Sequence, residues 1–191
     1  TGYTERWNGS TWTETTDLNT ARDSQGGTGA GGTTSALSVG GVPPGGQPNG
    51  TGNVEEFVGS QPVGAFATGV AVNASRSDGG GSGTREAALF FGGNDGSNGV
   101  SSNESFNGSA WTESADLNTA RWEIGSAGTS TSSLGAGGRV PGSPNLSGVV
   151  ESWNGSSWTN KSSLGTARKK GAMTGTDNEA TLYFGGNAGT P

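Results

Sequence analysis

Apolar positions along this chain come in short runs that Gly, Ser, Thr and Asn residues interrupt. The clearest runs are "ALFF" and "TLYF", and a pair of glycines stops each of them. No segment of ten residues keeps a helical apolar period without a glycine. Short runs bounded by turn residues are typical of β-strands. The pattern therefore predicts an all-β chain with almost no helix.

The pattern repeats four times along the chain. An aromatic residue recurs at intervals of 50, 49 and 47 residues, and a second aromatic follows each one. An Arg comes ten residues after every second aromatic, and a pair of glycines closes every unit. This fixed spacing indicates one supersecondary unit stacked on itself. The aromatics are Trp7, Trp12, Phe57, Phe66, Phe106, Trp111, Trp153 and Trp158.

The motif "WNGSTW" at residues 7–12 predicts a hairpin, because Asn-Gly favours a two-residue turn between antiparallel strands. With Asn8 and Gly9 as the turn, Trp7 pairs with Ser10, and Trp12 pairs with Glu5. Both indoles then project from one face of the hairpin. That face needs an apolar cover, which the next unit can supply. We therefore expect all eight aromatics to be buried between units.

Four strands in about fifty residues, with a glycine pair, two spaced aromatics and a following Arg, resemble the kelch repeat of β-propellers. The best copy is "LFFGGNDGSNGVSSNESFNGSAWTESADLNTAR". The stretches "ESWNGSSWT" and "LNTAR" are also similar to repeats in structural proteins of marine bacteriophages. The kelch resemblance implies an innermost strand that begins near the Arg, a second strand that ends at the glycine pair, and two outer strands that carry the aromatics.

The resemblance implies a single β-propeller domain, residues 1–191, of four four-stranded blades. N-terminal outer strands are expected to pair with C-terminal inner strands and close the ring, which removes open sheet edges. From Gly185 to the chain end and on to Trp7 is 13 steps, against 17, 14 and 16 in the other units. Because kelch propellers usually have more blades, and because the chain begins at Thr1, the alternative is an excerpt of something larger. The expected units are 17–68, 69–116, 117–163, and 164–191 closed by 1–16.

Composition narrows the function mainly by exclusion. The chain has no His and no Cys, so it lacks the commonest general base, the usual zinc ligands and disulfides. No nucleophile–base pair stands out, and we expect neither catalysis nor a cofactor nor a metal. The net charge is −6 with few Lys, which does not favour nucleic-acid binding. No apolar run approaches the roughly 18 residues of a membrane span, so membrane insertion is not expected.

Each unit carries one Arg and one Glu at fixed places. The resemblance implies that the Arg faces one mouth of the channel, where four guanidinium groups could hold an acidic peptide. The interpretation that we favour is a set of structural ion pairs that hold blade to blade. The residues are Arg22, Arg76, Arg121 and Arg168, with Glu5, Glu55, Glu104 and Glu151.

The predicted function is a non-enzymatic structural or adhesion module of a virion or extracellular surface assembly. Its expected partners are other protein subunits of that assembly, with cell-surface glycans as a second class. The alternative function is a binding module. In that case the propeller mouth binds acidic peptides, or Trp122 and the Ser/Thr/Asn-rich loops bind glycans as in a lectin.

Overall fold

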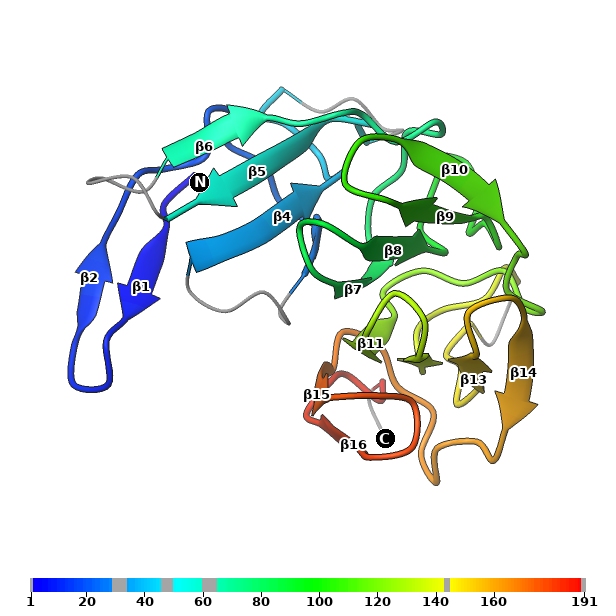
Figure 1. Ribbon diagram of the computed structural model, residues 1–191. Coiled ribbons are helices and arrows are strands. Elements are labelled where there is room, and N and C mark those ends of the chain that lie inside the picture. Colours follow the sequence, from blue (N-terminus) through cyan, green and yellow to red (C-terminus); the bar gives the residue numbers. More distant parts are fainter. Residues whose placement is uncertain (1, 29–33, 46–49, 60–64, 143–144, 190–191) are drawn as a thin grey trace.

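The computed structural model describes residues 2–28, 34–45, 50–59, 65–142 and 145–189. These residues form sixteen β-strands and no α-helix. The prediction of an all-β chain is therefore confirmed. The strands make three four-stranded antiparallel sheets and two two-stranded ones, arranged along an open arc (Figure 1).

Each four-stranded sheet contains strands that follow one another in the chain, so its topology is a simple meander. Sheet 1 contains β3 (Gly26–Gly27), β4 (Ser35–Val39), β5 (Val54–Val58) and β6 (Ala65–Thr68). Sheet 2 contains β7 (Gly80–Gly83), β8 (Ala88–Phe91), β9 (Asn103–Phe106) and β10 (Trp111–Ser114). Sheet 3 contains β11 (Gly125–Gly128), β12 (Ser133–Ala136), β13 (Val150–Trp153) and β14 (Trp158–Lys161). These strands fall within the three units expected at 17–68, 69–116 and 117–163.

The first strand of each sheet lies on the inner side of the arc and is rich in glycine (Figure 1). Strand β7 contacts both β3 and β11, so neighbouring inner strands come close to one another. A Cβ atom at Gly81 would lie 2.9 Å from the backbone oxygen of Gly27. A larger residue would push the inner strands apart, which explains why this part of each unit is poor in side chains.

Two apolar clusters join consecutive sheets. The first joins Leu37 and Val39 of sheet 1 to Phe106 and Trp111 of sheet 2. The second joins Phe91 of sheet 2 to the outer strands of sheet 3 through Trp153 and Trp158. The rings of Phe91 and Trp158 lie 4.6 Å apart, centroid to centroid. The aromatic pairs of sheets 2 and 3 thus pack against the second strand of the preceding sheet.

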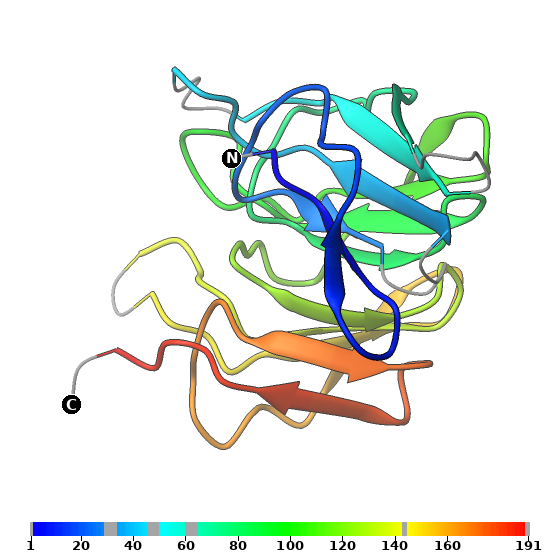
Figure 2. The ribbon, with the colours of Figure 1, turned by 90° about the vertical axis from the view of Figure 1, so that its left-hand side faces the viewer.

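Two hairpins stand at the ends of the arc, and each has half the strands of a sheet. One consists of β1 (Glu5–Trp7) and β2 (Trp12–Glu14), the other of β15 (Ala172–Gly175) and β16 (Thr181–Phe184). They were expected to pair and close the ring. In the described residues, however, they remain separate two-stranded sheets, well apart in Figure 1. Figure 2 looks along the arc from the side of the β1–β2 hairpin.

The expected burial of all eight aromatics is wrong for this first hairpin. Trp7 is 45% exposed and Trp12 is 64% exposed, whereas the equivalent Trp153 and Trp158 are 2% and 6% exposed. Phe66 is half-buried and contacts Phe57. The reason is that no second strand of a preceding sheet lies against the β1–β2 hairpin in the described residues. The buried aromatics are Phe57, Phe106, Trp111, Trp153 and Trp158.

The expected register of the hairpin is also wrong. Trp7 lies directly opposite Trp12, not opposite Ser10. The side-chain oxygen of Asn8 accepts hydrogen bonds from the backbone N–H groups of Ser10 and Thr11, at 2.9 and 3.0 Å. These bonds stabilise a loop of four residues in place of a two-residue turn. The two indoles therefore face each other, with ring centroids 5.5 Å apart.

Candidate functional site

The three complete sheets each bury one Arg–Glu ion pair. The pairs are Arg22 with Glu55, Arg76 with Glu104, and Arg121 with Glu151, with N–O distances of 2.5, 2.5 and 3.0 Å. Each Arg precedes the first strand of its sheet, and each Glu lies on the third strand of the same sheet. The expectation that these pairs join one blade to the next is therefore wrong. They lock the connection that enters a sheet onto that sheet.

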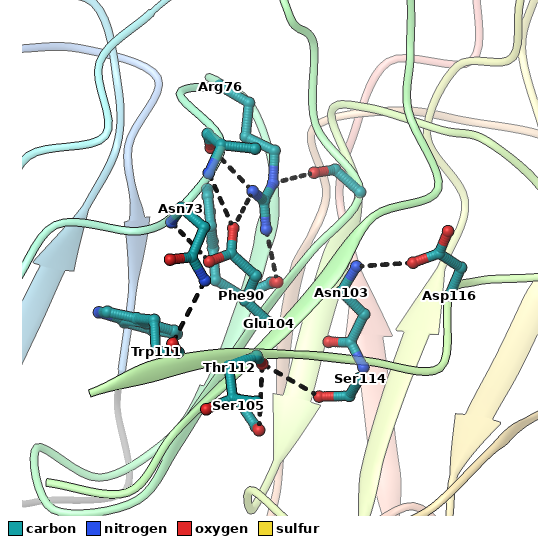
Figure 3. A network of polar contacts seen from close by, with 12 residues as sticks. Asn73, Arg76, Phe90, Asn103, Glu104, Ser105, Trp111, Thr112, Ser114 and Asp116 are labelled. Carbon is teal, nitrogen blue, oxygen red and sulfur yellow. Dashed lines mark hydrogen bonds and ion pairs between the residues drawn. The ribbon is translucent and has the colours of Figure 1, made fainter. Parts of the chain in front are cut away.

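The carboxylate of each pair is held by backbone donors as well as by Arg. Glu104 accepts hydrogen bonds from the N–H groups of Asn73 and Ala74, at 2.7 and 3.3 Å (Figure 3). The side-chain amide of Asn73 in turn donates to the carbonyl oxygen of Trp111 at 3.2 Å. One loop thus binds the buried carboxylate and an outer strand together. The same bonds recur from Asn19 to Glu55 and Phe66, and from Asn118 to Glu151 and Trp158.

The guanidinium of each pair also donates to backbone carbonyls. Arg76 donates to Gly92 at 2.9 Å and to Phe90 at 2.8 Å, and it lies 4.4 Å over the Phe90 ring (Figure 3). Arg22 and Arg121 likewise donate to the first glycine of their own pair, Gly40 and Gly137. The first glycine of the pair therefore has a structural role in each of the three complete sheets. The glycine carbonyl is one of the acceptors of the Arg.

Burial governs the electrostatics of these pairs. It lowers the pKa of Arg76 and Arg121 from the ordinary value, and the Glu partner of each opposes that effect. Arg22, Arg76 and Arg121 are almost wholly buried and bind groups of their own sheet. These three side chains do not offer a ring of guanidinium groups to a ligand.

The fourth predicted pair, Arg168 with Glu5, is not brought together. Glu5 is exposed on β1, and no cation of the described residues lies within ion-pair distance of it. Arg168 is half-buried at the start of the β15–β16 unit, with its guanidinium 4.8 Å over the ring of Tyr183. Its Nε is buried and has no hydrogen-bond partner in the described part of the chain. Among the described residues, the β15–β16 hairpin therefore has an Arg without a carboxylate partner, and the β1–β2 hairpin has a Glu without a guanidinium partner.

A row of equivalent residues, which the sequence reasoning missed, lies two positions after the Arg residues. Ser24, Asp78, Glu123 and Lys170 all have a positive φ, between 53° and 56°, which is uncommon outside glycine. Each of the last three donates its N–H to the carbonyl of the member before it: Asp78 to Ser24, Glu123 to Asp78, and Lys170 to Glu123. The only available signal was their shared position in the repeat.

Charged side chains also gather along this row. Glu123 accepts ion pairs from Lys169 and Lys170 at 3.0 and 3.2 Å. Burial raises the pKa of Asp78, and the neighbouring Glu123 raises it further. Among the described residues, no group of three or more carboxylate, His or Cys side chains is arranged to hold a metal ion.

The inner strands line an open pocket of about 650 Å³. Its lining is made of small uncharged residues and one Met, so it offers no acid, base or charged group to a ligand. The main lining residues are Gly81, Ser126, Gly128, Met173 and Thr174.

Trp122, the candidate for stacking on sugars, is half-buried and packed within the fold. The guanidinium of Arg139 lies 5.4 Å from the centre of its ring. The backbone at Gly99 lies so close that a Cβ atom there would overlap the indole.

Comparisons with known proteins add no assignment. No protein-family model matches the chain, and a search of curated proteins gave no match. Within the described residues, there is no helix with the length and apolar character that crossing a membrane requires.

Proposed function

We propose that the chain is a non-enzymatic structural or adhesion module of a virion or extracellular surface assembly, built from kelch-like propeller blades. The observation that carries this proposal is the use of the repeated charges. Three Arg–Glu pairs are buried inside three sheets and hold each sheet to its entering loop. The most regular chemistry of the chain thus serves stability, as expected of a building block.

The fold that we propose for the assembled protein has a complete fourth blade. Strand β1 lies beside β16, which gives the strand order β15-β16-β1-β2, as in the three complete sheets. The register follows by analogy with Phe90 opposite Glu104, and with Gly135 opposite Glu151. It sets Tyr183 opposite Glu5 and completes the four-stranded blade that the repeat predicts.

The exposed apolar side chains support this completion. Trp7, Trp12, Leu182 and Phe184 are all at least 45% exposed, and all four lie on the two unpaired hairpins. Contiguous exposed apolar surface usually marks an interaction site. Other protein subunits are the proposed partners, because association with them would bury the exposed apolar side chains of the two hairpins.

Completion of the blade can be tested by hydrogen exchange. The amides of β16 and β1 are expected to exchange as slowly as those of β8 and β9 in the assembled protein. Rapid exchange in both end hairpins, with slow exchange in sheet 2, would contradict the proposed fourth blade.

The place of the protein can be tested by electron microscopy with an antibody raised against the chain. Regular labelling of a virion or of an extracellular filament is the expected result. Label that is confined to the cell interior would contradict the proposed function, whatever the exchange experiment shows.

A further inference from the structure

We propose that the β1–β2 hairpin that completes the fourth blade comes from a second copy of this chain. The inference rests on the proposed completion of that blade and names its partner. It is carried by the position of the two hairpins, by their complementary charges and by their exposed apolar faces.

The β1–β2 hairpin is already folded as it would be inside a complete sheet. Thr4 accepts a bond from the N–H of Thr15 and donates its own N–H to Asp17. Leu18 donates to the carbonyl of Gly2 at 3.0 Å, as Leu117 donates to Ser101 in sheet 2. The hairpin therefore needs no rearrangement before it can add to another sheet edge.

Each hairpin is also attached to its own neighbour in the way that complete sheets are. Asn19 binds Glu55 and Phe66 just as Asn118 binds Glu151 and Trp158. At the other end, Lys170 donates to Glu123 at 3.0 Å, as Glu123 donates to Asp78.

With these normal attachments, the arc leaves the two hairpins apart (Figure 1). Joining them within one copy would have to change contacts between consecutive sheets. Joining the hairpin of a second copy changes none of them, so the second copy is the favoured source.

The charges of the two hairpins are complementary. Arg168 lacks a carboxylate, and Glu5 lacks a guanidinium and backbone donors, in the described residues. In sheet 3, Glu151 accepts hydrogen bonds from the N–H groups of Asn118 and Thr119 and also forms the ion pair with Arg121. By the same spacing, Gly165 and Thr166 present their N–H groups to Glu5 of the second copy, beside Arg168.

The apolar faces match in the same way. Trp153 and Trp158 of sheet 3 pack against the second strand of sheet 2. Trp7 and Trp12 of the second copy would pack equivalently on β12 of the first. Leu182 and Phe184 would then cover the pair Phe57 and Phe66 of the second copy. The contact uses a different surface on each copy, so it forms a closed ring of copies or extends as a filament.

Disulfide trapping distinguishes the source of the hairpin. The register of the complete sheets puts Arg6 opposite Leu182, as Ser105 is opposite Leu89. Directly opposite residues of antiparallel strands are close enough for a disulfide. The chain has no Cys of its own, so the variants Arg6→Cys and Leu182→Cys introduce the only thiols. A matched control is Thr13→Cys, which lies opposite Arg6 on the outer strand, away from the free edge.

Mixing the two single variants under mild oxidation is expected to give a covalent heterodimer on a non-reducing gel. Mixing Thr13→Cys with Leu182→Cys is expected to give none. If the double variant forms only an internal disulfide and the mixture gives no heterodimer, one copy completes its own blade. That result overturns this inference and leaves the proposed function standing. If no cross-link forms in any sample, both the inference and the proposed fourth blade are wrong.

Charge reversal provides a second, reversible test by light scattering. Glu5→Arg and Arg168→Glu should each weaken self-association by about tenfold or more, because each juxtaposes like charges in a buried contact. Glu86→Arg makes the same change of charge at an exposed residue between β7 and β8, away from both hairpins, and should have little effect. Mixing the two reversed variants restores one correct pair per junction, so association should recover. Failure of the mixture to associate, while the wild type does, would show that Glu5 and Arg168 do not meet between copies.

Discussion

Arg121 illustrates what a buried charge requires of its surroundings. Its guanidinium binds Glu151 at 3.0 Å and the carbonyls of Gly137 and Val149, at 2.8 and 2.9 Å. Removal of the Arg leaves a buried carboxylate without its counter-charge.

Arg121→Ala is therefore expected to lower the free energy of unfolding by about 3–5 kcal/mol. Urea denaturation followed by tryptophan fluorescence measures this loss. Arg168→Ala is the control in dilute protein, because Arg168 is half-buried and has no carboxylate partner among the described residues. Equal, small losses in both variants would contradict the structural role of the pair.

Asp78 gives a prediction about pH. Burial raises its pKa above the ordinary value, so the native state keeps the proton longer than the unfolded chain does as pH rises. The stability contributed by Asp78 is present below its unfolded pKa and is lost as pH rises through the raised folded pKa. Lys170 opposes this effect without reversing its direction.

Asp78→Asn removes the titration and keeps a side chain that tolerates a positive φ. The melting temperature of the variant relative to wild type should therefore rise between acid and neutral pH. Calorimetry over that range measures the difference. A difference that does not change with pH would contradict the raised pKa.

At the residue scale, the spacing in the sequence was enough to identify the Arg and Glu residues of the three buried pairs. It could not show that each pair lies within one sheet, because a periodic position does not say which neighbour a side chain contacts. The positive φ at Ser24 and its equivalents was also hidden, since Ser, Asp, Glu and Lys share no preference for that conformation.

Among the structural elements, the outer hairpin occurs in two environments that permit a direct comparison. Trp111 is 6% exposed, and its indole N–H donates to Val70 at 2.9 Å, whereas Trp12 lies at the equivalent place with no such cover.

Trp111→Ala should lower the free energy of unfolding by about 3–5 kcal/mol, because it empties a core position. Trp12→Ala should leave the stability of the dilute protein almost unchanged and weaken self-association. Chemical denaturation and light scattering measure the two effects. Similar stability losses in both variants would indicate that Trp12 is already buried in the single copy.

The loop before β15 differs from its equivalents at one residue. Asn19, Asn73 and Asn118 each tie an outer strand to the loop, and the fourth unit has Gly165 at that position. A Cβ at Gly165 meets no atom within 4 Å, and its φ is not positive, so a side chain fits.

Gly165→Asn should therefore strengthen self-association, because the new amide can donate to the carbonyl of Trp12 in the added hairpin. Gly165→Ala is the matched control and should have no such effect. Sedimentation velocity compares the two variants. Equal association of both would contradict the proposed position of the hairpin.

Apolar runs and glycine pairs were enough to predict the strands, but they did not predict the register of the β1–β2 hairpin. Asn-Gly predicts a tight turn from backbone preference alone. In this hairpin the side chain of Asn8 binds two N–H groups and selects a longer loop. These hydrogen bonds come from a side chain, and a rule that considers only the backbone preference of Asn-Gly does not predict them.

For the whole molecule, the sequence predicted the three complete four-stranded sheets and their order, but not that the fourth unit remains two separate hairpins. The 13 steps from Gly185 across the two ends to Trp7 are a count along the sequence and do not say how far apart the two hairpins lie. Closure also depends on the angle between consecutive sheets. That angle is set by how side chains such as Phe91 and Trp158 pack, which spacing does not reveal.

The unlike hairpins at the two ends of the arc would give any assembly a direction. One end of a row of copies would display only β1–β2, and the other only β15–β16. Growth and its arrest could then be controlled separately at each end. A trace of the Glu5→Arg variant, which can receive a hairpin but cannot donate one, would act as a chain terminator. The mean length of a filament would fall as its mole fraction rises.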